Sequence, residues 1–183
     1  MRIKNLALFI TSSFLALSLA YLPISAKAAL EKGTAAPSFS AKNQDGKIVS
    51  LSDFTGKAVL LYFYPKDDTP GCTKEACSFR DEFANFKAMG AVVLGVSRQD
   101  AKSHQEFRSK HKLPFDLLVD DKGLIAKAYD VGSIPLMGLT KRQSILLDKN
   151  GLVIKFYKDV DPNTHAAEVL KELAANQANT PQQ

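Results

Sequence analysis

The sequence has no tryptophan, only two cysteines and only three histidines among its 183 residues. Two cysteines are too few for a disulfide-dense scaffold or for a zinc site made of four cysteines. The chain has no large excess of either charge, because it has 24 Lys and Arg residues and 19 Asp and Glu residues. Arg2, Lys4 and Lys27 lie in the first 28 residues, and the remaining 21 basic residues are too nearly balanced by acids to predict a nucleic-acid-binding face. The apolar fraction of 45% is typical of a folded protein.

The first 28 residues have the three-part pattern of a secretory signal peptide. A short basic start at 1–5 is followed by a mostly apolar, uncharged stretch at 6–24, and Ala26 and Ala28 offer the small residues of a cleavage site. A retained membrane anchor is the alternative, because the apolar stretch approaches the length of a membrane span. No cysteine follows the stretch, which argues against a lipoprotein anchor. We therefore predict a bacterial periplasmic protein that has no membrane attachment after the signal peptide is cleaved.

The rest of the chain predicts a single α/β domain over residues 29–175, followed by a polar tail over 176–183. Continuous apolar and β-branched runs are typical of strands buried on both faces, and apolar residues that recur every three or four positions are typical of helices. We expect strands at 46–51, 58–64, 91–96, 115–119 and 144–147, a hairpin partner at 152–158, and helices at 73–89, 103–111, 123–129 and 163–175. The alternation of strand and helix, with a hairpin near the end, predicts a central mixed β-sheet with helices on both faces.

Chemically reactive residues concentrate between Pro65 and Cys77, directly after the apolar run at 58–64. Open α/β sheets bind ligands beyond the carboxyl ends of their strands, which is where this Pro- and Gly-containing segment lies. A helix is expected to begin near Cys72, whose thiolate would then be stabilised by unpaired backbone N–H groups and by the positive end of the helix dipole. Because the thiolate is the nucleophilic form of cysteine, Cys72 is a candidate nucleophile.

Cys77 lies five residues after Cys72, in the same expected helix. A structural disulfide is the ordinary use of two cysteines in an exported protein. In an α-helix, however, Cα atoms five residues apart are separated by roughly 8–9 Å, whereas a disulfide wants less than about 7 Å. Either the helix is absent, or the bond forms only when the helix unwinds, as a redox-active pair would allow.

The segment from Phe63 to Cys77, FYPKDDTPGCTKEAC, resembles the active-site segment of the peroxiredoxins, and in particular of the bacterioferritin-comigratory, or Q-type, subfamily. Pro65, Thr69 and Cys72 meet the family pattern Pro-x-x-x-Thr-x-x-Cys, and Cys77 stands where the subfamily has its second cysteine. The resemblance continues at 95–97, 103–107, 113–115 and 142–148, and it spans about residues 32–175.

This resemblance implies a thioredoxin-like fold and a thiol-dependent peroxidase that reduces hydrogen peroxide and organic hydroperoxides without a metal or a bound organic cofactor. Cys72 matches the peroxidatic cysteine, which attacks the O–O bond and becomes a sulfenic acid. Cys77 matches the resolving cysteine, which then forms an intramolecular disulfide with Cys72. The implied partner is a thioredoxin-like or other thiol reductant, and we expect the enzyme to be a monomer.

The resemblance also implies roles for residues around Cys72. Thr69 matches the residue whose hydroxyl contacts the peroxide, and Arg142 matches the distant arginine that stabilises the thiolate and polarises the peroxide. Pro65 would shield the site from water, and the backbone N–H groups of Gly71 and Cys72 would help to hold the substrate. Without the motif, Thr69 would be explained as a loop hydroxyl or a helix cap, and Arg142 as a surface residue.

Two other classes of protein compete with this interpretation. A periplasmic thioredoxin-like disulfide oxidoreductase is expected to carry C-x-x-C, and a copper-delivery protein of the same fold needs a well-placed histidine beside two cysteines; the C-x-x-x-x-C spacing fits neither well. A non-catalytic secreted binding domain would have unreactive thiols. His104, His111 and His165 are scattered along the chain, and we expect them to be surface residues rather than metal ligands.

Overall fold

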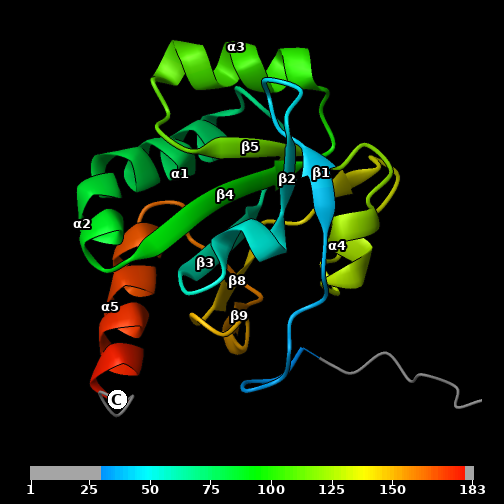
Figure 1. Ribbon diagram of the computed structural model, residues 1–183. Coiled ribbons are helices and arrows are strands. Elements are labelled where there is room, and N and C mark those ends of the chain that lie inside the picture. Colours follow the sequence, from blue (N-terminus) through cyan, green and yellow to red (C-terminus); the bar gives the residue numbers. More distant parts are fainter. Residues whose placement is uncertain (1–29, 180–183) are drawn as a thin grey trace, which may run out of the picture.

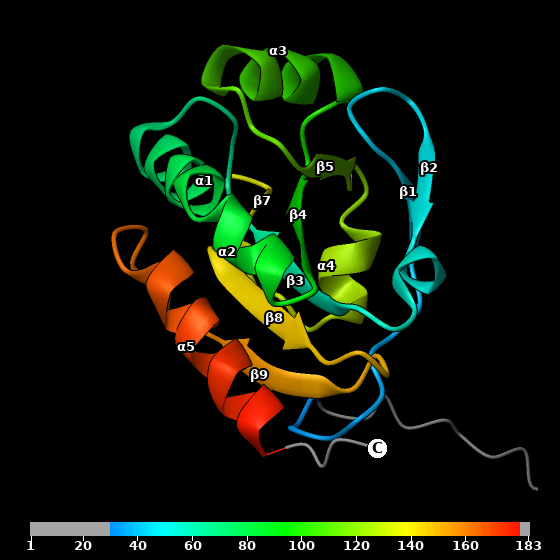
Figure 2. The same ribbon diagram turned by 60° about the vertical axis from the view of Figure 1, so that its left-hand side comes forward.

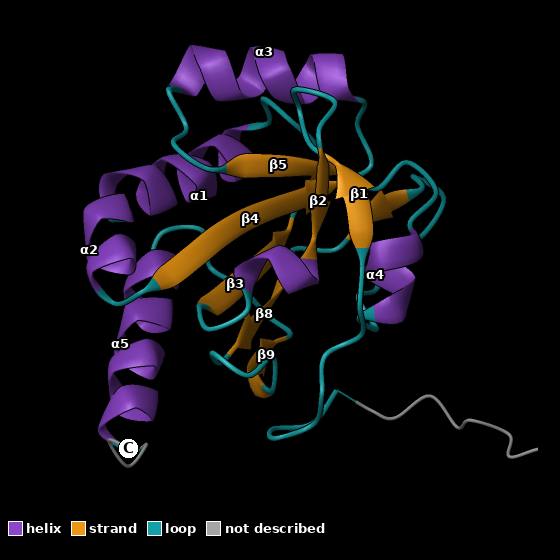
Figure 3. Cartoon of the chain, in the orientation of Figure 1, coloured by secondary structure: helices purple, strands orange, loops and turns teal. Residues whose placement is uncertain are grey.

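The computed structural model describes residues 30–179, so the predicted signal peptide at 1–28 and the last four residues lie outside the described part of the chain. Five strands form the central sheet (Figures 1 and 3). Their order across the sheet is β5 (Asp116–Val119), β4 (Ala91–Ser97), β3 (Ala58–Phe63), β8 (Gln143–Leu147) and β9 (Val153–Tyr157). β3 is parallel to β4 and antiparallel to β8, and β8 and β9 form an antiparallel hairpin. The predicted mixed sheet is confirmed.

Helices cover both faces of this sheet (Figure 2). One face carries α1 (Pro70–Asp81), α2 (Phe83–Ala88) and α5 (His165–Ala178), while α4 (Leu124–Ala128) lies on the other; α3 (Ala101–His111) lies beside the edge strand β5. Side chains of a strand alternate between faces, so the apolar run of β3 serves two cores. One core holds Leu60, Tyr62 and Tyr64, and the other holds Val59, Leu61 and Phe63.

The helix predicted over 73–89 is in fact two helices, and it begins earlier. Thr69 is the N-cap of α1 and Pro70 is its first residue, a position that suits proline because its ring fixes φ and its missing N–H would be unpaired there anyway. Glu82 interrupts the helix with a φ of −91° and a ψ of 3°. This turn separates α1 from α2 while Phe79 and Phe86, one on each helix, are both fully buried.

Other boundaries differ because short elements leave weak patterns. The strand expected at 46–51 is β2 (Ile48–Ser50), which pairs with β1 (Ser40–Lys42) in a separate two-stranded sheet. A second small sheet pairs β6 (Ser133–Ile134) with β7 (Leu139–Thr140), and a 3₁₀ turn follows β2 at Leu51–Phe54.

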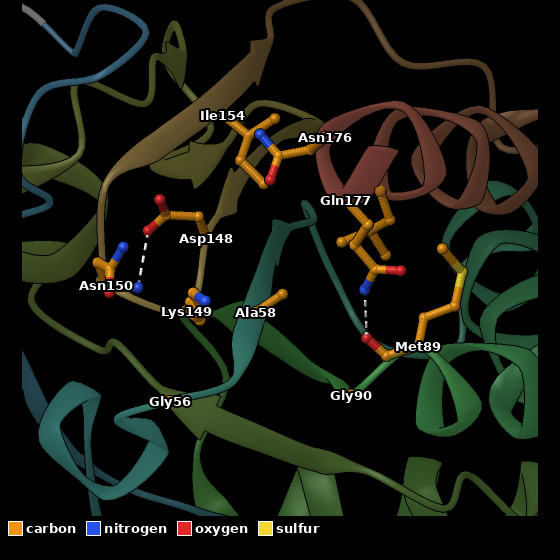
Figure 4. Close-up of a pocket in the computed structure, with 11 residues that line it drawn as sticks. Gly56, Ala58, Met89, Gly90, Asp148, Lys149, Asn150, Ile154, Asn176 and Gln177 are labelled. Carbon is orange, nitrogen blue, oxygen red and sulfur yellow. Dashed lines mark hydrogen bonds between the residues drawn. The ribbon is translucent and has the colours of Figure 1, made fainter. Parts of the chain in front are cut away.

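The last helix extends three residues into the segment predicted to be a polar tail. α5 ends at Ala178 rather than near residue 175, and the Gln177 amide donates a hydrogen bond to the Met89 carbonyl at 2.8 Å (Figure 4). This bond ties the end of α5 to the end of α2 beside a pocket at the start of β3, whose first residue, Ala58, lines it. The chemically reactive segment follows the opposite end of β3.

The prediction that the histidines lie on the surface is wrong for two of the three. His104 and His165 are fully buried, and His111 is half-buried. Each buried ring has a hydrogen-bond partner that makes burial tolerable. His165 Nε2 lies 2.9 Å from Ser144 Oγ, and His104 contacts Asp67 and the Leu118 carbonyl.

The buried side chain of His165 makes the stability of the protein sensitive to acid. Burial lowers the pKa of His165 from 6.5 to about 4, because the apolar surroundings disfavour the imidazolium. As pH falls below 6.5 the unfolded chain therefore binds a proton before the folded chain does, and the free energy of unfolding should fall by up to about 3 kcal/mol between pH 6.5 and pH 4. Glu75 acts in the opposite sense, because its pKa is raised.

We expect His165→Gln to flatten this pH dependence, although the substitution itself costs stability. The difference between the unfolding free energies at pH 7 and pH 4.5, measured in urea, should shrink by about 2–3 kcal/mol. An unchanged difference would show that another group causes the acid sensitivity.

Candidate active site

Cys72 lies in the first turn of α1, directly beyond the end of β3. Its side chain is only 1% exposed, and both Cys72 and Cys77 are free thiols. The first backbone bond of the helix runs from the Thr73 N–H to the Thr69 carbonyl at 2.9 Å. The preceding N–H groups of Gly71 and Cys72 therefore belong to the turn that has no acceptor within a helix. Together with the helix dipole they favour negative charge at this end, as the sequence predicted.

Arg142 reaches Cys72 from a distant part of the chain. It immediately precedes β8, and β8 pairs with β3 so that Gln143 lies opposite Phe63. This pairing brings the guanidinium to the end of β3, where Nη2 lies 3.3 Å from the Cys72 Sγ. A guanidinium at this distance stabilises the thiolate by charge and by hydrogen bonding. The explanation of Arg142 as an ordinary surface residue is therefore excluded.

Gly71 leaves room for this guanidinium. A Cβ atom at position 71 would lie 3.1 Å from Arg142 Nη2, closer than side-chain atoms ordinarily approach. A larger residue would push the arginine away from the sulfur. Gly71 therefore contributes space as well as its backbone N–H group.

Glu75 is a site residue that the sequence analysis missed. It lies one helical turn after Cys72, is fully buried, and pairs through Oε2 with Arg142 Nη1. Burial raises the pKa of Glu75 to about 7 even though Arg142 opposes the shift. For Arg142, burial works to lower the pKa, but Glu75 and Cys72 outweigh it and the pKa is raised. The spacing of three residues was the available signal, because it places Glu75 on the face of the helix that carries Cys72.

Thr69 is the N-cap of the helix that carries Cys72, and Pro65 lines a pocket beside the site. The Thr69 hydroxyl donates to the Lys66 carbonyl at 3.1 Å, so in this structure it faces the loop rather than the sulfur. Pro65 and Arg142 line an open pocket together with Ile134, Val160, Lys141, Lys158, Asp159, Asp161 and Glu168. The pocket combines apolar surface with charged groups of both signs, and Arg142 connects it to the buried sulfur.

Cys77 is half-buried and lies in α1, as predicted. Cys77 lies five positions after Cys72 in the same helix, so the two Cα atoms are roughly 8–9 Å apart by helix geometry, too far for a disulfide. No group of three His, Cys, Asp or Glu residues within 30–179 is arranged to hold a metal ion. Over the same residues, no helix is long and apolar enough to cross a membrane.

The sequence matches the family model described as the AhpC/TSA family over residues 32–156, more than half of the chain. The chain belongs to this family. Peroxiredoxin Q from the chloroplast of Oryza sativa subsp. japonica is 49% identical over 145 residues, which are 79% of this chain and 67% of the relative. Peroxiredoxin Bcp of Bacillus subtilis (strain 168) is 45% identical over 150 residues, which are 79% of this chain and 95% of the relative.

A solved structure shows the same fold. The bacterioferritin comigratory protein of Xanthomonas campestris, described for its alkyl peroxide reduction activity, superimposes with a TM-score of 0.71 and 33% identity, covering 75% of this chain and 91% of that one. The protein is thus a peroxiredoxin of the Q type with a thioredoxin-like fold, and it is a thiol-dependent peroxidase. This assignment takes the place of the three alternatives considered from the sequence, which were a disulfide oxidoreductase, a copper-delivery protein and a non-catalytic binding domain.

Proposed function

We propose that Cys72 is the peroxidatic nucleophile of this enzyme and Cys77 its resolving thiol. The Cys72 thiolate attacks one peroxide oxygen, the O–O bond breaks, and the leaving oxygen departs with a proton as water or an alcohol. Cys72 becomes a sulfenic acid. The Cys77 thiol then attacks that sulfur, so that a disulfide forms and water leaves. The observation that carries this proposal is the contact of 3.3 Å between Arg142 Nη2 and Cys72 Sγ at the start of a helix.

The surrounding groups suit the charge that develops on the peroxide oxygens. Arg142 contacts the Cys72 sulfur, and the N–H groups of Gly71 and Cys72 belong to the same first turn of α1; donors of this kind stabilise a transition state most where water is excluded. Pro65 contributes to that exclusion. Thr69 would contact the peroxide by turning its hydroxyl away from the Lys66 carbonyl, a rotation about a single bond.

The second step requires α1 to open. Because the two cysteines cannot be bridged across an intact helix, disulfide formation must unwind α1 between them. Helix ends open more readily than helix interiors, so the opening is expected to start from the N-terminal end of α1, where Cys72 lies. A thioredoxin-like dithiol would then return two electrons by thiol–disulfide exchange.

Rapid mixing of the reduced protein with one equivalent of hydrogen peroxide tests this cycle. We expect the wild-type chain to lose two thiols per peroxide consumed. Cys77→Ser should lose one thiol, leave Cys72 as a sulfenic acid that dimedone traps, and over-oxidise at high peroxide. Ser78→Ala, one residue further along the helix, serves as the control and should behave as wild type. Retention of both thiols in the wild-type protein while peroxide disappears would contradict the proposal.

Substrate range, assembly and location extend the proposal. By similarity to the Xanthomonas campestris protein we propose organic hydroperoxides as substrates beside hydrogen peroxide. We propose a domain over 29–175 that acts as a monomer without metal or cofactor, because a disulfide formed within one chain needs no second subunit.

The pattern of residues 1–28 supports export to the periplasm and release from the membrane. A mature N-terminus at residue 29 in the periplasmic fraction is the expected result, and an uncleaved chain in the membrane would contradict it.

A further inference from the structure

The loop that precedes Cys72 is held by a buried carboxylate. Asp67 lies in this loop with its side chain only 5% exposed. Its Oδ1 accepts a hydrogen bond from the Tyr64 hydroxyl at 2.7 Å. Its Oδ2 accepts one from the Ser103 hydroxyl at 2.7 Å and lies 2.8 Å from His104 Nδ1. One carboxylate thus connects the end of β3, the active-site loop and helix α3.

His104 completes the network of hydrogen-bonding groups around Asp67. Its ring is fully buried, and its second nitrogen, Nε2, lies 3.2 Å from the Leu118 carbonyl at the end of β5. A carbonyl oxygen and a carboxylate both only accept hydrogen bonds, so each ring nitrogen of His104 lies against an acceptor. Removing one partner of such a buried pair is costly, because the polar group that remains is shielded from water and has lost its hydrogen-bond partner.

Asp68, the next residue, is held by the same helix. Its φ of 56° is in the left-handed region, which non-glycine residues seldom adopt. Its Oδ1 lies 2.8 Å from His111 Nε2 and 3.1 Å from Lys110 Nζ, both on α3. Two consecutive residues of the loop are therefore fastened to α3, and the chain is free of these contacts only from Thr69 onward.

We propose that Asp67 is a positioning residue that fastens the active-site loop to α3 through His104 and Ser103, and so determines where the unwinding of α1 begins. This inference rests on the proposed two-step cycle. While the loop is fastened, the first turn of α1 keeps Cys72 aligned with Arg142 for the attack on peroxide. When α1 opens for the disulfide, the opening stops at Thr69 because the two preceding residues stay on α3.

The consequence is that weakening this attachment should affect the two chemical steps in opposite directions. A loosened loop misaligns Cys72, and small errors of position slow a reaction that depends on preorganised donors. The same loosening makes the opened form of α1 more populated, so disulfide closure becomes faster. A general loss of stability has no reason to separate the two steps in this way.

Asp67→Asn tests the proposal by rapid quenching at single turnover, with sulfenic acid trapped by dimedone and the disulfide identified by mass. We expect sulfenic acid formation to slow about tenfold or more, in line with the loss of preorganisation, and disulfide closure to speed up several-fold. Ser103→Ala, which removes one neutral donor, should shift both rates in the same directions by less and remains informative if Asp67→Asn does not fold.

Asp120→Asn is the matched control. Asp120 is also a buried carboxylate, but it accepts hydrogen bonds from the Ile125 and Ala126 N–H groups at 3.0 and 2.9 Å, at α4 on the opposite face of the sheet. Its substitution should lower stability while leaving both rate constants unchanged. If Asp67→Asn and Ser103→Ala change both rates by equal factors, or leave them as Asp120→Asn does, the proposal is wrong.

Amide hydrogen exchange of the reduced proteins separates this proposal from the cycle on which it rests. Asp67→Asn should raise exchange over residues 66–72 and leave β4 and β8 protected. Unchanged exchange over 66–72 would overturn the positioning role even if the wild-type enzyme forms its sulfenic acid and disulfide as proposed. Failure of the wild-type enzyme to form either species would instead overturn the proposed function.

Discussion

Cys72→Ser is expected to abolish peroxide consumption. A serine hydroxyl is not ionised near neutral pH, so neither the guanidinium of Arg142 nor the helix start can convert it into a nucleophile comparable with a thiolate. Enzymes that lose their nucleophile lose activity on the order of 10⁴-fold or more, and we expect a loss of this size. The measurement is the second-order rate constant for hydrogen peroxide consumption, with an excess of dithiol reductant.

Cys77→Ser provides the comparison for this result. It keeps the nucleophile, so it should still consume one peroxide per chain and should turn over slowly when an external thiol replaces the resolving cysteine. Cys72→Ser keeps Cys77, which is half-buried further along α1 and lies away from the Arg142 contact. Near-normal peroxide consumption by Cys72→Ser would refute the assignment of the nucleophile.

Replacement of Arg142 should have the second largest effect. Arg142→Ala removes the donor that lies 3.3 Å from the Cys72 sulfur, and the loss of one strong transition-state donor slows catalysis by about 10²–10³-fold. Arg142→Lys should recover only part of this loss, because an ammonium group lacks the planar fork that contacts the sulfur and Glu75 together. The rate constant of sulfenic acid formation, measured at single turnover, is the quantity to compare.

The Arg142→Ala protein should remain folded, which makes the experiment interpretable. Glu75 loses its ion-pair partner, but its pKa is already raised to about 7, and without the arginine the buried carboxyl takes up a proton and becomes neutral. Lys141→Ala is the matched control, because Lys141 is the exposed neighbouring cation that lines the same pocket mouth. An unchanged rate of sulfenic acid formation in Arg142→Ala would show that the guanidinium has no part in the chemistry.

The buried histidines show where sequence patterns stop being informative. His104 sits among polar and charged residues of α3, and its neighbours Ser103 and Gln105 give no sign that its ring is buried. What makes its burial tolerable is Asp67, 37 positions earlier, whose carboxylate gives the ring a buried hydrogen-bond partner. Glu75 is similar, because a glutamate in a helix is ordinarily exposed, whereas here it is buried and paired with Arg142, 67 positions later.

The sequence by itself determined the strands of the central sheet and the segment that carries the chemistry. Apolar runs such as 58–64 and 91–96 can be buried only inside a sheet covered on both faces, and the Pro- and Gly-containing segment after the first run indicated a loop that leads into a helix near Cys72, although the helix starts earlier than predicted, at Pro70. Tertiary structure alone decided which distant charges meet this segment. The pairing of β8 with β3 delivers Arg142 to Cys72, and the contact of α3 with the loop delivers His104 to Asp67. Both depend on contacts between residues far apart in the chain, and no periodicity within a single element encodes the partner of a charge.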